Sequence, residues 1–133
     1  MSGGKPKILM VDDELSVLET YGSKLANSGY KVITAISGHE TVKLARKHWP
    51  DMIVLDIIMP MADGYEVLAK LKSDMLTKNI PVLVLSQQGQ KDCINRGLLT
   101  GADRYLIKAR YTPAEFVEQV NYFMSQKTSV KRG

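Results

Sequence analysis

A continuous apolar run that ends in an aspartate constrains the fold of this chain most strongly. Residues 52–55 (MIVL) lead directly into Asp56. An apolar run without polar alternation is typical of a strand that is buried on both faces of a sheet. Asp56 is then expected where the strand emerges from the core. In open parallel sheets ligands bind at the carboxyl ends of the strands, so a functional site is expected at this edge.

Strand-like and helical patterns alternate five times along the chain. The predicted strands cover residues 7–11, 30–36, 52–55, 82–85 and 105–107. Helical patterns follow them at residues 14–27, 37–48, from Asp63 onward, 90–99 and 112–126. Such alternation predicts an α/β fold, a doubly wound five-stranded parallel sheet with five helices on its two faces.

Turn and cap residues mark several of these boundaries. Gly29 is suited to a left-handed cap at the end of the first helix. Ser37 and Glu40 fit a capping box, in which each residue's side chain bonds the other's backbone. Thr112 is predicted to cap the last helix with Glu115 as its partner in a second capping box, and Pro113 is expected at the first helical position.

Composition and charge exclude several classes of protein. A length of 133 residues with 44% hydrophobic and 24% charged residues fits one globular domain. The sequence has no apolar run of membrane-spanning length, and its lone Cys93 agrees with a reducing compartment, so we expect a cytoplasmic protein.

The net charge of +4 comes from the two ends of the chain, while residues 8–126 carry −1. We therefore expect no membrane partner and no direct nucleic-acid binding, with a domain at 6–126 and flexible tails at 1–5 and 127–133.

Charged and polar side chains follow four of the five predicted strands. Asp12 and Asp13 follow the first, Asp56 the third, Ser86 the fourth and Lys108 the fifth. Each alone is an ordinary turn or cap residue, but a parallel sheet brings all of them to one edge. Clustered carboxylates repel one another unless a cation intervenes. A hard divalent metal such as Mg²⁺, which binds through carboxylates and a phosphate, suits this set.

Across residues 6–124 the chain resembles the receiver domains of two-component response regulators. The matching residues are Val11, Asp12, Asp13, Glu14, Asp56, Met59, Pro60, Asp63, Gly64, Ser86, Gly101, Ala102, Tyr105 and Lys108. Their order, strand context and spacings all agree with that family. The resemblance implies a flavodoxin-like strand order of 2-1-3-4-5.

The resemblance also implies a role for each site residue. Asp56 would accept a phosphoryl group from the phosphohistidine of a sensor histidine kinase or of a histidine phosphotransfer protein. Mg²⁺ would be bound by Asp13, by Asp56 and by the backbone carbonyl of Ile58, with Asp12 helping through water. Lys108 would pair with Asp56 and then with the phosphoryl group.

The family's switch residues correspond to Ser86 and Tyr105. Ser86 would bond a phosphoryl oxygen and draw its loop inward, while Tyr105 would turn from exposed to buried. A downstream protein would then bind the face formed by the fourth helix, fifth strand and fifth helix. The chain would be a signalling phosphoacceptor that catalyses only its own phosphorylation and slow dephosphorylation.

Two positions depart from the family's pattern, and two more bear on how fast the phosphoryl group is lost. Ala109 follows Lys108 where the family has a proline in a cis peptide, so we predict a trans bond and a somewhat different loop at 108–112. Gln87 stands where a small residue is usual, which predicts narrower access to Asp56. Ile58 and Gln88 occupy positions that tune loss of the phosphoryl group. Because Ile58 cannot orient an attacking water, we predict slow self-dephosphorylation.

Two other functions fit parts of the pattern. A phosphatase of the haloacid-dehalogenase type also uses a strand-tip aspartate, magnesium and a lysine, but it expects a second aspartate where this chain has Ile58. A degenerate receiver would act only as a protein-interaction module. Asp12, Asp13, Asp56 and Lys108 argue against degeneracy, whereas Gln87 and Ala109 leave room for it.

Overall fold

The structure is a computed structural model that describes residues 4–59 and 62–132, with side chains up to Gln126 except that of Ala62. Its strands are β1 (Lys7–Val11), β2 (Lys31–Ala35), β3 (Met52–Leu55), β4 (Ile58–Met59), β5 (Ala62–Asp63), β6 (Val82–Ser86) and β7 (Arg104–Ile107). Its α-helices are α1 (Leu15–Asn27), α2 (Thr41–His48), α3 (Gly64–Ser73), α4 (Lys91–Thr100) and α5 (Pro113–Arg132). Two short 3-10 helices are η1 (Gly38–Glu40) and η2 (Lys108–Arg110).

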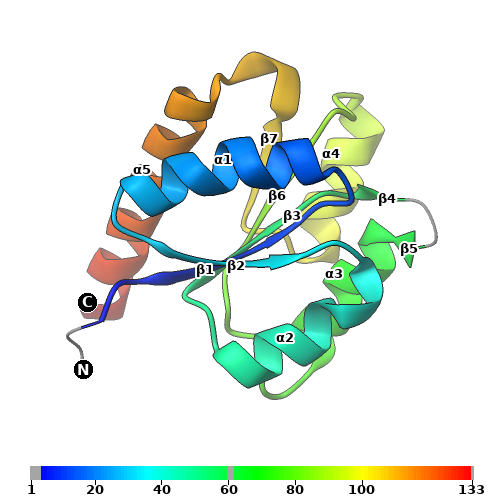
Figure 1. The fold of residues 1–133 in the computed structure, drawn as a ribbon. Coiled ribbons are helices and arrows are strands. Elements are labelled where there is room, and N and C mark those ends of the chain that lie inside the picture. The colour runs from blue at the N-terminus through cyan, green and yellow to red at the C-terminus, as the bar shows by residue number, and fades with distance from the viewer. Residues whose placement is uncertain (1–3, 60–61, 133) are drawn as a thin grey trace.

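The central sheet confirms the predicted α/β fold. Within the described residues it has five parallel strands in the order β2-β1-β3-β6-β7, which is the order 2-1-3-4-5 of the sheet strands. All four residues of β3 are buried, as its unbroken apolar run predicts. The remaining strands, β4 and β5, form a small antiparallel hairpin after β3. Figure 1 shows this hairpin beyond the end of β3, with helices on both sides of the sheet.

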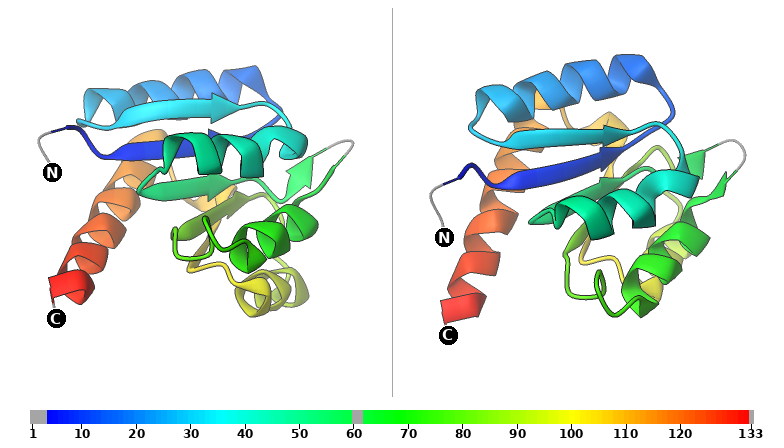
Figure 2. Two further views of the ribbon diagram at one scale, coloured as in Figure 1. Left: turned by 90° about the horizontal axis from the view of Figure 1, so that it is seen from below. Right: turned by 60° about the horizontal axis from the view of Figure 1, so that its bottom comes forward.

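Successive residues of each strand point into two separate cores, as strand geometry requires. Ile8 and Met10 of β1 pack with α1 and α5, and Leu9 and Val11 pack in the second core with α2 and α3. The views of Figure 2 show the same sandwich from two other directions. Because both faces are covered, polar side chains collect at the ends of the strands.

Several predicted boundaries are corrected by the structure. The α2 region begins with the 3-10 turn η1, so the capping box predicted there is wrong: the Ser37 side chain makes no capping hydrogen bond. Glu40 instead accepts a hydrogen bond from the backbone N–H of Ile36, at 3.1 Å. The last helix continues to Arg132, so its predicted end near Gln126 is wrong. The domain limits of 6–126 and the flexibility of the tails stay predictions.

Other local predictions are confirmed. Gly29 has the positive φ, 101°, that a left-handed cap requires. Thr112 accepts a hydrogen bond from the backbone of Glu115 at 3.1 Å, and the Glu115 carboxylate accepts one from the Thr112 backbone at 2.9 Å. This reciprocal pair is the capping box that the sequence predicts for α5.

Candidate functional site

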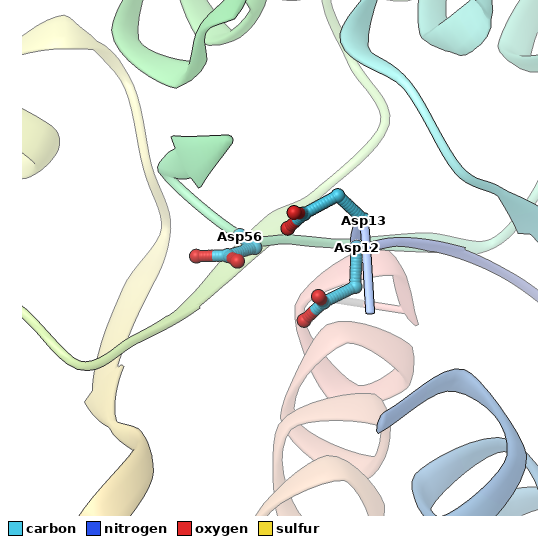
Figure 3. Close-up of side chains that lie close together, drawn as sticks. All are labelled: Asp12, Asp13 and Asp56. Carbon is cyan, nitrogen blue, oxygen red and sulfur yellow. The ribbon is translucent and has the colours of Figure 1, made fainter. Parts of the chain in front are cut away.

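Three carboxylates meet at the carboxyl edge of the sheet. Asp12 and Asp13 follow β1, Asp56 follows β3, and one oxygen from each lies within 4.8 Å of the others. Figure 3 shows the three side chains gathered where these two neighbouring strands end. Asp12 and Asp56 are buried, while Asp13 is exposed. The structure therefore assembles the acidic cluster that the sequence predicts.

Burial sets the electrostatics of Asp56. Desolvation and the neighbouring Asp12 raise the pKa of Asp56 from 3.8 to about 7. The Lys108 ammonium and a hydrogen bond from the Ile58 backbone lower it, but by less. That hydrogen bond joins the Ile58 nitrogen to Oδ1 of Asp56 at 3.1 Å and holds the carboxylate toward the β4 turn. A bound cation would relieve this repulsion.

Lys108 pairs with a different aspartate from the one predicted. Its Nζ lies 3.2 Å from Oδ2 of Asp12, and the predicted pairing with Asp56 is corrected on this point. Asp12 is 2% exposed, so its charge needs a partner inside the protein. Its other oxygen accepts a hydrogen bond from the Glu14 backbone at 3.0 Å. Lys108 still contributes positive charge to Asp56 across the cluster.

Ser86 and Tyr105 are joined through the loop that follows β6. Ser86 is buried at the end of β6, and its Oγ accepts a hydrogen bond from the backbone N–H of Gln88 at 3.1 Å. The Tyr105 hydroxyl donates to the backbone carbonyl of Gln88 at 2.7 Å. Tyr105 is half-buried, and burial raises the pKa of its hydroxyl. The structure thus has Tyr105 turned toward the loop, and it does not test the predicted turn from exposed to buried.

A cavity of about 300 Å³ opens over the acidic cluster. Its lining consists of Asp13, Glu14, Asp56, Ile58, Gln87, Gln88 and Lys108. Gln87 is on the rim and exposed, which keeps the prediction of narrowed access open. Ile58 is 52% exposed and presents an aliphatic side chain to solvent. The cavity is thus small and combines charged side chains with the aliphatic Ile58.

The cluster has the donor chemistry that Mg²⁺ requires. Its three carboxylates are hard oxygen donors within one ion's reach. Burial, together with the charge of Asp12, raises the pKa of Asp56, and a divalent cation would offset both effects. Mg²⁺ typically takes a small number of carboxylates and keeps several waters. The residues therefore fit this metal.

The chain after Lys108 agrees with the expectation for Ala109. The described residues contain no cis peptide bond, so the predicted trans bond between Lys108 and Ala109 is confirmed. The chain turns there through η2 (Lys108–Arg110). Pro60, one of the residues that match the receiver family, lies outside the described residues.

The structure gives Gly64 a role that the sequence motif alone did not explain. A β-carbon at Gly64 would lie 2.3 Å from the backbone oxygen of Ile57, next to Asp56. The Gly64 nitrogen also donates to that oxygen at 3.1 Å, and Asp63 caps α3 by accepting from the Tyr65 backbone at 2.9 Å. Glycine is therefore needed for α3 to begin directly against the residue after Asp56.

A larger hollow of about 670 Å³ lies between α2 and α3, away from the acidic cluster. Arg46 and Asp74 in its lining form an ion pair with each other. Among the described residues, the carboxylates close enough together to hold a metal ion are Asp12, Asp13 and Asp56, and they do not line this hollow. Separately, no helix within the described residues combines the length and apolarity needed to cross a membrane.

Comparison with known proteins identifies the family. The model of the response regulator receiver domain matches residues 8–121. The chain is 39% identical over 124 residues to the transcriptional regulatory protein PrrA of Mycobacterium tuberculosis, covering 93% of this chain and 52% of that protein. It is 33% identical over 118 residues to the phosphate regulon regulatory protein PhoB of Escherichia coli, covering 89% and 51%.

A solved structure agrees. The crystal structure of a response regulator from Chloroflexus aurantiacus is 34% identical, with a TM-score of 0.82, and the match covers 91% of this chain and 99% of that one. The chain spans about half the length of the curated relatives above. With its family model, fold and acidic cluster in agreement, the chain belongs to the response regulator receiver domains, the phosphoacceptor modules of two-component signalling.

Proposed function

We propose that Asp56 is the phosphoacceptor of this domain and takes its phosphoryl group from a phosphohistidine. The observation that carries the proposal is the position of Asp56: a buried carboxylate at the tip of the central strand, within reach of two more carboxylates and close to a lysine. A carboxylate oxygen of Asp56 attacks phosphorus as the bond to the histidine nitrogen breaks. The cavity above Asp56 admits the donor.

The other residues of the site would bind the metal ion and supply positive charge. Asp13, Asp56 and the backbone carbonyl of Ile58 would hold Mg²⁺, and Asp12 would assist through water. When bound, the metal supplies positive charge to the oxygens of the transferred phosphoryl group. Lys108 follows β7 at the same edge of the sheet, 3.2 Å from Asp12, and would contribute a second positive charge.

Ser86 is suited to bind the transferred group. Its Oγ accepts a hydrogen bond from the Gln88 backbone, and its hydroxyl hydrogen would turn from the neighbouring Tyr105 hydroxyl to a phosphoryl oxygen. Tyr105 bonds the same Gln88 and would transmit the change at Ser86 to the outer surface. This link supports their assignment as switch residues.

We propose a sensor histidine kinase or a histidine phosphotransfer protein as the donor. A downstream protein would bind the face formed by α4, β7 and α5. The single Cys93 favours a reducing, cytoplasmic location.

Beryllofluoride with Mg²⁺, a stable mimic of the phosphoryl group, tests the proposal. The wild-type domain should show a saturable change in its amide NMR spectrum that is absent with EDTA and in Asp56→Asn. A second sample with Mg²⁺ and acetyl phosphate measures turnover. Sustained multiple turnover would support a phosphatase of the haloacid-dehalogenase type instead, and no response to either reagent would support a degenerate, interaction-only receiver.

A further inference from the structure

Gly97 lies inside α4 (Lys91–Thr100), where helix geometry gives no reason for a glycine. Glycine is among the least favourable residues for a helix interior. The described glycines with positive φ are Gly29 and Gly101, so Gly97 does not have the backbone conformation that favours glycine. Gly97 is also the buried residue of α4. The explanation must therefore lie in what packs against it.

The ring of Tyr105 occupies the space that a side chain at Gly97 would need. A β-carbon at this position would lie 2.9 Å from Cδ2 and 3.0 Å from Cε2 of Tyr105. Contacts this short are repulsive, because favourable carbon–carbon separations are about 3.5–4.0 Å. Tyr105 in its present position therefore requires glycine at 97.

The helix has less freedom to move away than the ring has. The Tyr65 hydroxyl donates to the backbone carbonyl of Cys93 at 3.1 Å, and the Arg96 guanidinium stacks on the Tyr65 ring at 3.9 Å. These contacts tie α4 to α3. Tyr105 is half-buried on β7 and can turn outward about its own side-chain bonds. A side chain at position 97 should therefore displace Tyr105.

Displacing Tyr105 would release one of the two hydrogen bonds that hold the Gln88 backbone. The Tyr105 hydroxyl bonds the Gln88 carbonyl at 2.7 Å, and Ser86 Oγ bonds the Gln88 nitrogen at 3.1 Å. Gln88 in turn lines the cavity over Asp56. The loop is thus fixed at the cavity by a chain of contacts that begins at Gly97.

We infer that Gly97 is a positioning residue for the phosphoryl site: by leaving room for Tyr105 it keeps the Gln88 loop in place over Asp56. This inference rests on the proposed function of Asp56, Ser86 and Tyr105. Gly97, on α4 and outside the site, would then control how well the site accepts a phosphoryl group. A ligand that binds more tightly when the Gln88 loop lies over Asp56 therefore loses affinity when a substitution turns Tyr105 outward.

Gly22 provides a matched control. It is also a buried glycine inside an α-helix, α1, but a β-carbon there would meet only Cγ1 of Val32, at an ordinary 3.7 Å. Gly22→Ala and Gly97→Ala therefore make the same chemical change with and without a steric clash. Any general effect of replacing a helical glycine appears in both variants.

The test is a double-mutant cycle on beryllofluoride affinity with Mg²⁺, measured by calorimetry. Gly97→Ala should weaken binding by about tenfold, because overpacking shifts the tyrosine. Gly22→Ala should leave the affinity unchanged. In a Tyr105→Ala background, where no ring remains to clash, Gly97→Ala should have no effect on affinity. An unchanged affinity in Gly97→Ala, or an equal loss in both backgrounds, overturns the inference.

Ring-proton NMR of Tyr105 separates failure of this inference from failure of the proposed function. In Gly97→Ala the Tyr105 signals should move toward those of an exposed tyrosine, whether or not the domain binds beryllofluoride. If the wild-type domain binds no beryllofluoride, the proposed function fails, and the ring signals alone decide the role of Gly97: unchanged signals overturn it. If Gly97→Ala does not fold, recovery of folding in Gly97→Ala/Tyr105→Ala supports the clash, and failure of both overturns it.

Discussion

Replacing Asp56 with asparagine should stabilise the metal-free domain, although it removes the proposed phosphoacceptor. Burial and the neighbouring Asp12 raise the pKa of Asp56 from 3.8 to about 7. The folded domain therefore holds a proton on Asp56 more tightly than the unfolded chain does. The contribution of Asp56 to the free energy of unfolding is most favourable below pH 3.8, the pKa in the unfolded chain. It is lost as the pH rises toward about 7, the pKa in the folded domain. Asparagine has nearly the same shape but carries no charge, so the Asp56→Asn variant does not lose this stability as the pH rises.

The magnitude follows from the size of the pKa change. A rise of about 3 units at roughly 1.4 kcal/mol per unit sets an upper limit of about 4 kcal/mol. The carboxylate faces a cavity that is open to solvent, which screens the charge. We therefore expect Asp56→Asn to raise the free energy of unfolding by about 2 kcal/mol at pH 8. At pH 4 the increase in the free energy of unfolding should be only about 0.3 kcal/mol.

Urea unfolding with EDTA, followed by circular dichroism at pH 4 and pH 8, measures both values. Asp74→Asn is a control of opposite sign, because a hydrogen bond from Arg46 lowers the pKa of Asp74. Added Mg²⁺ should reduce the advantage of Asp56→Asn at pH 8, since the cation stabilises the wild-type cluster. If Asp56→Asn is less stable than the wild type at pH 8 without metal, or if its gain in stability does not depend on pH, burial of the Asp56 charge does not destabilise the domain.

Three further substitutions probe the surroundings of Asp56. Lys108→Ala leaves the buried Asp12 carboxylate without its partner, so the free energy of unfolding at pH 7.5 should fall by about 2 kcal/mol in urea titrations. Gly64→Ala forces a β-carbon to 2.3 Å from the backbone oxygen of Ile57, and should cost about 3 kcal/mol or more by the same measurement. Ile58→Asn places an amide at the cavity and should shorten the lifetime of the phosphorylated domain, followed by loss of label after donor removal.

A different result would contradict each of these three predictions. Wild-type stability in Lys108→Ala would mean that the ion pair contributes nothing net in solution. For the glycine, Gly22→Ala is the matched control, and equal effects at both glycines would contradict the close approach at Gly64. A longer phosphorylated lifetime in Ile58→Asn than in the wild type would count against the idea that an aliphatic side chain slows water attack.

The sheet and its functional edge could be predicted because they depend on patterns that are local in sequence. An apolar run such as residues 52–55 has to be buried, and the residue that follows it has to emerge at the sheet edge. Asp12, Asp13 and Asp56 could thus be brought together without coordinates, since parallel strands share one edge. The capping box of Thr112 and Glu115 was visible for the same reason, because its partners are three residues apart.

Features that depend on distances between side chains could not be read from the sequence. Lys108 had several carboxylates within its possible reach, and only geometry selects Asp12. The 3-10 turn at Gly38–Glu40 replaced an expected cap because the chain tightens before α2 begins. Helix propensity alone gives no reason for Gly97 in α4, because the reason is Tyr105, which is a neighbour in space and lies outside the helix.

Asp56 is proposed to accept a phosphoryl group in a Mg²⁺-dependent way. Intact mass spectrometry after incubation with acetyl phosphate, followed by peptide mapping, locates any phosphoryl group that is added. We expect one added phosphoryl group per chain, located on Asp56, present with Mg²⁺ and absent with EDTA or in Asp56→Asn. Phosphorylation at another residue, or equal labelling of the wild type and Asp56→Asn, would contradict it.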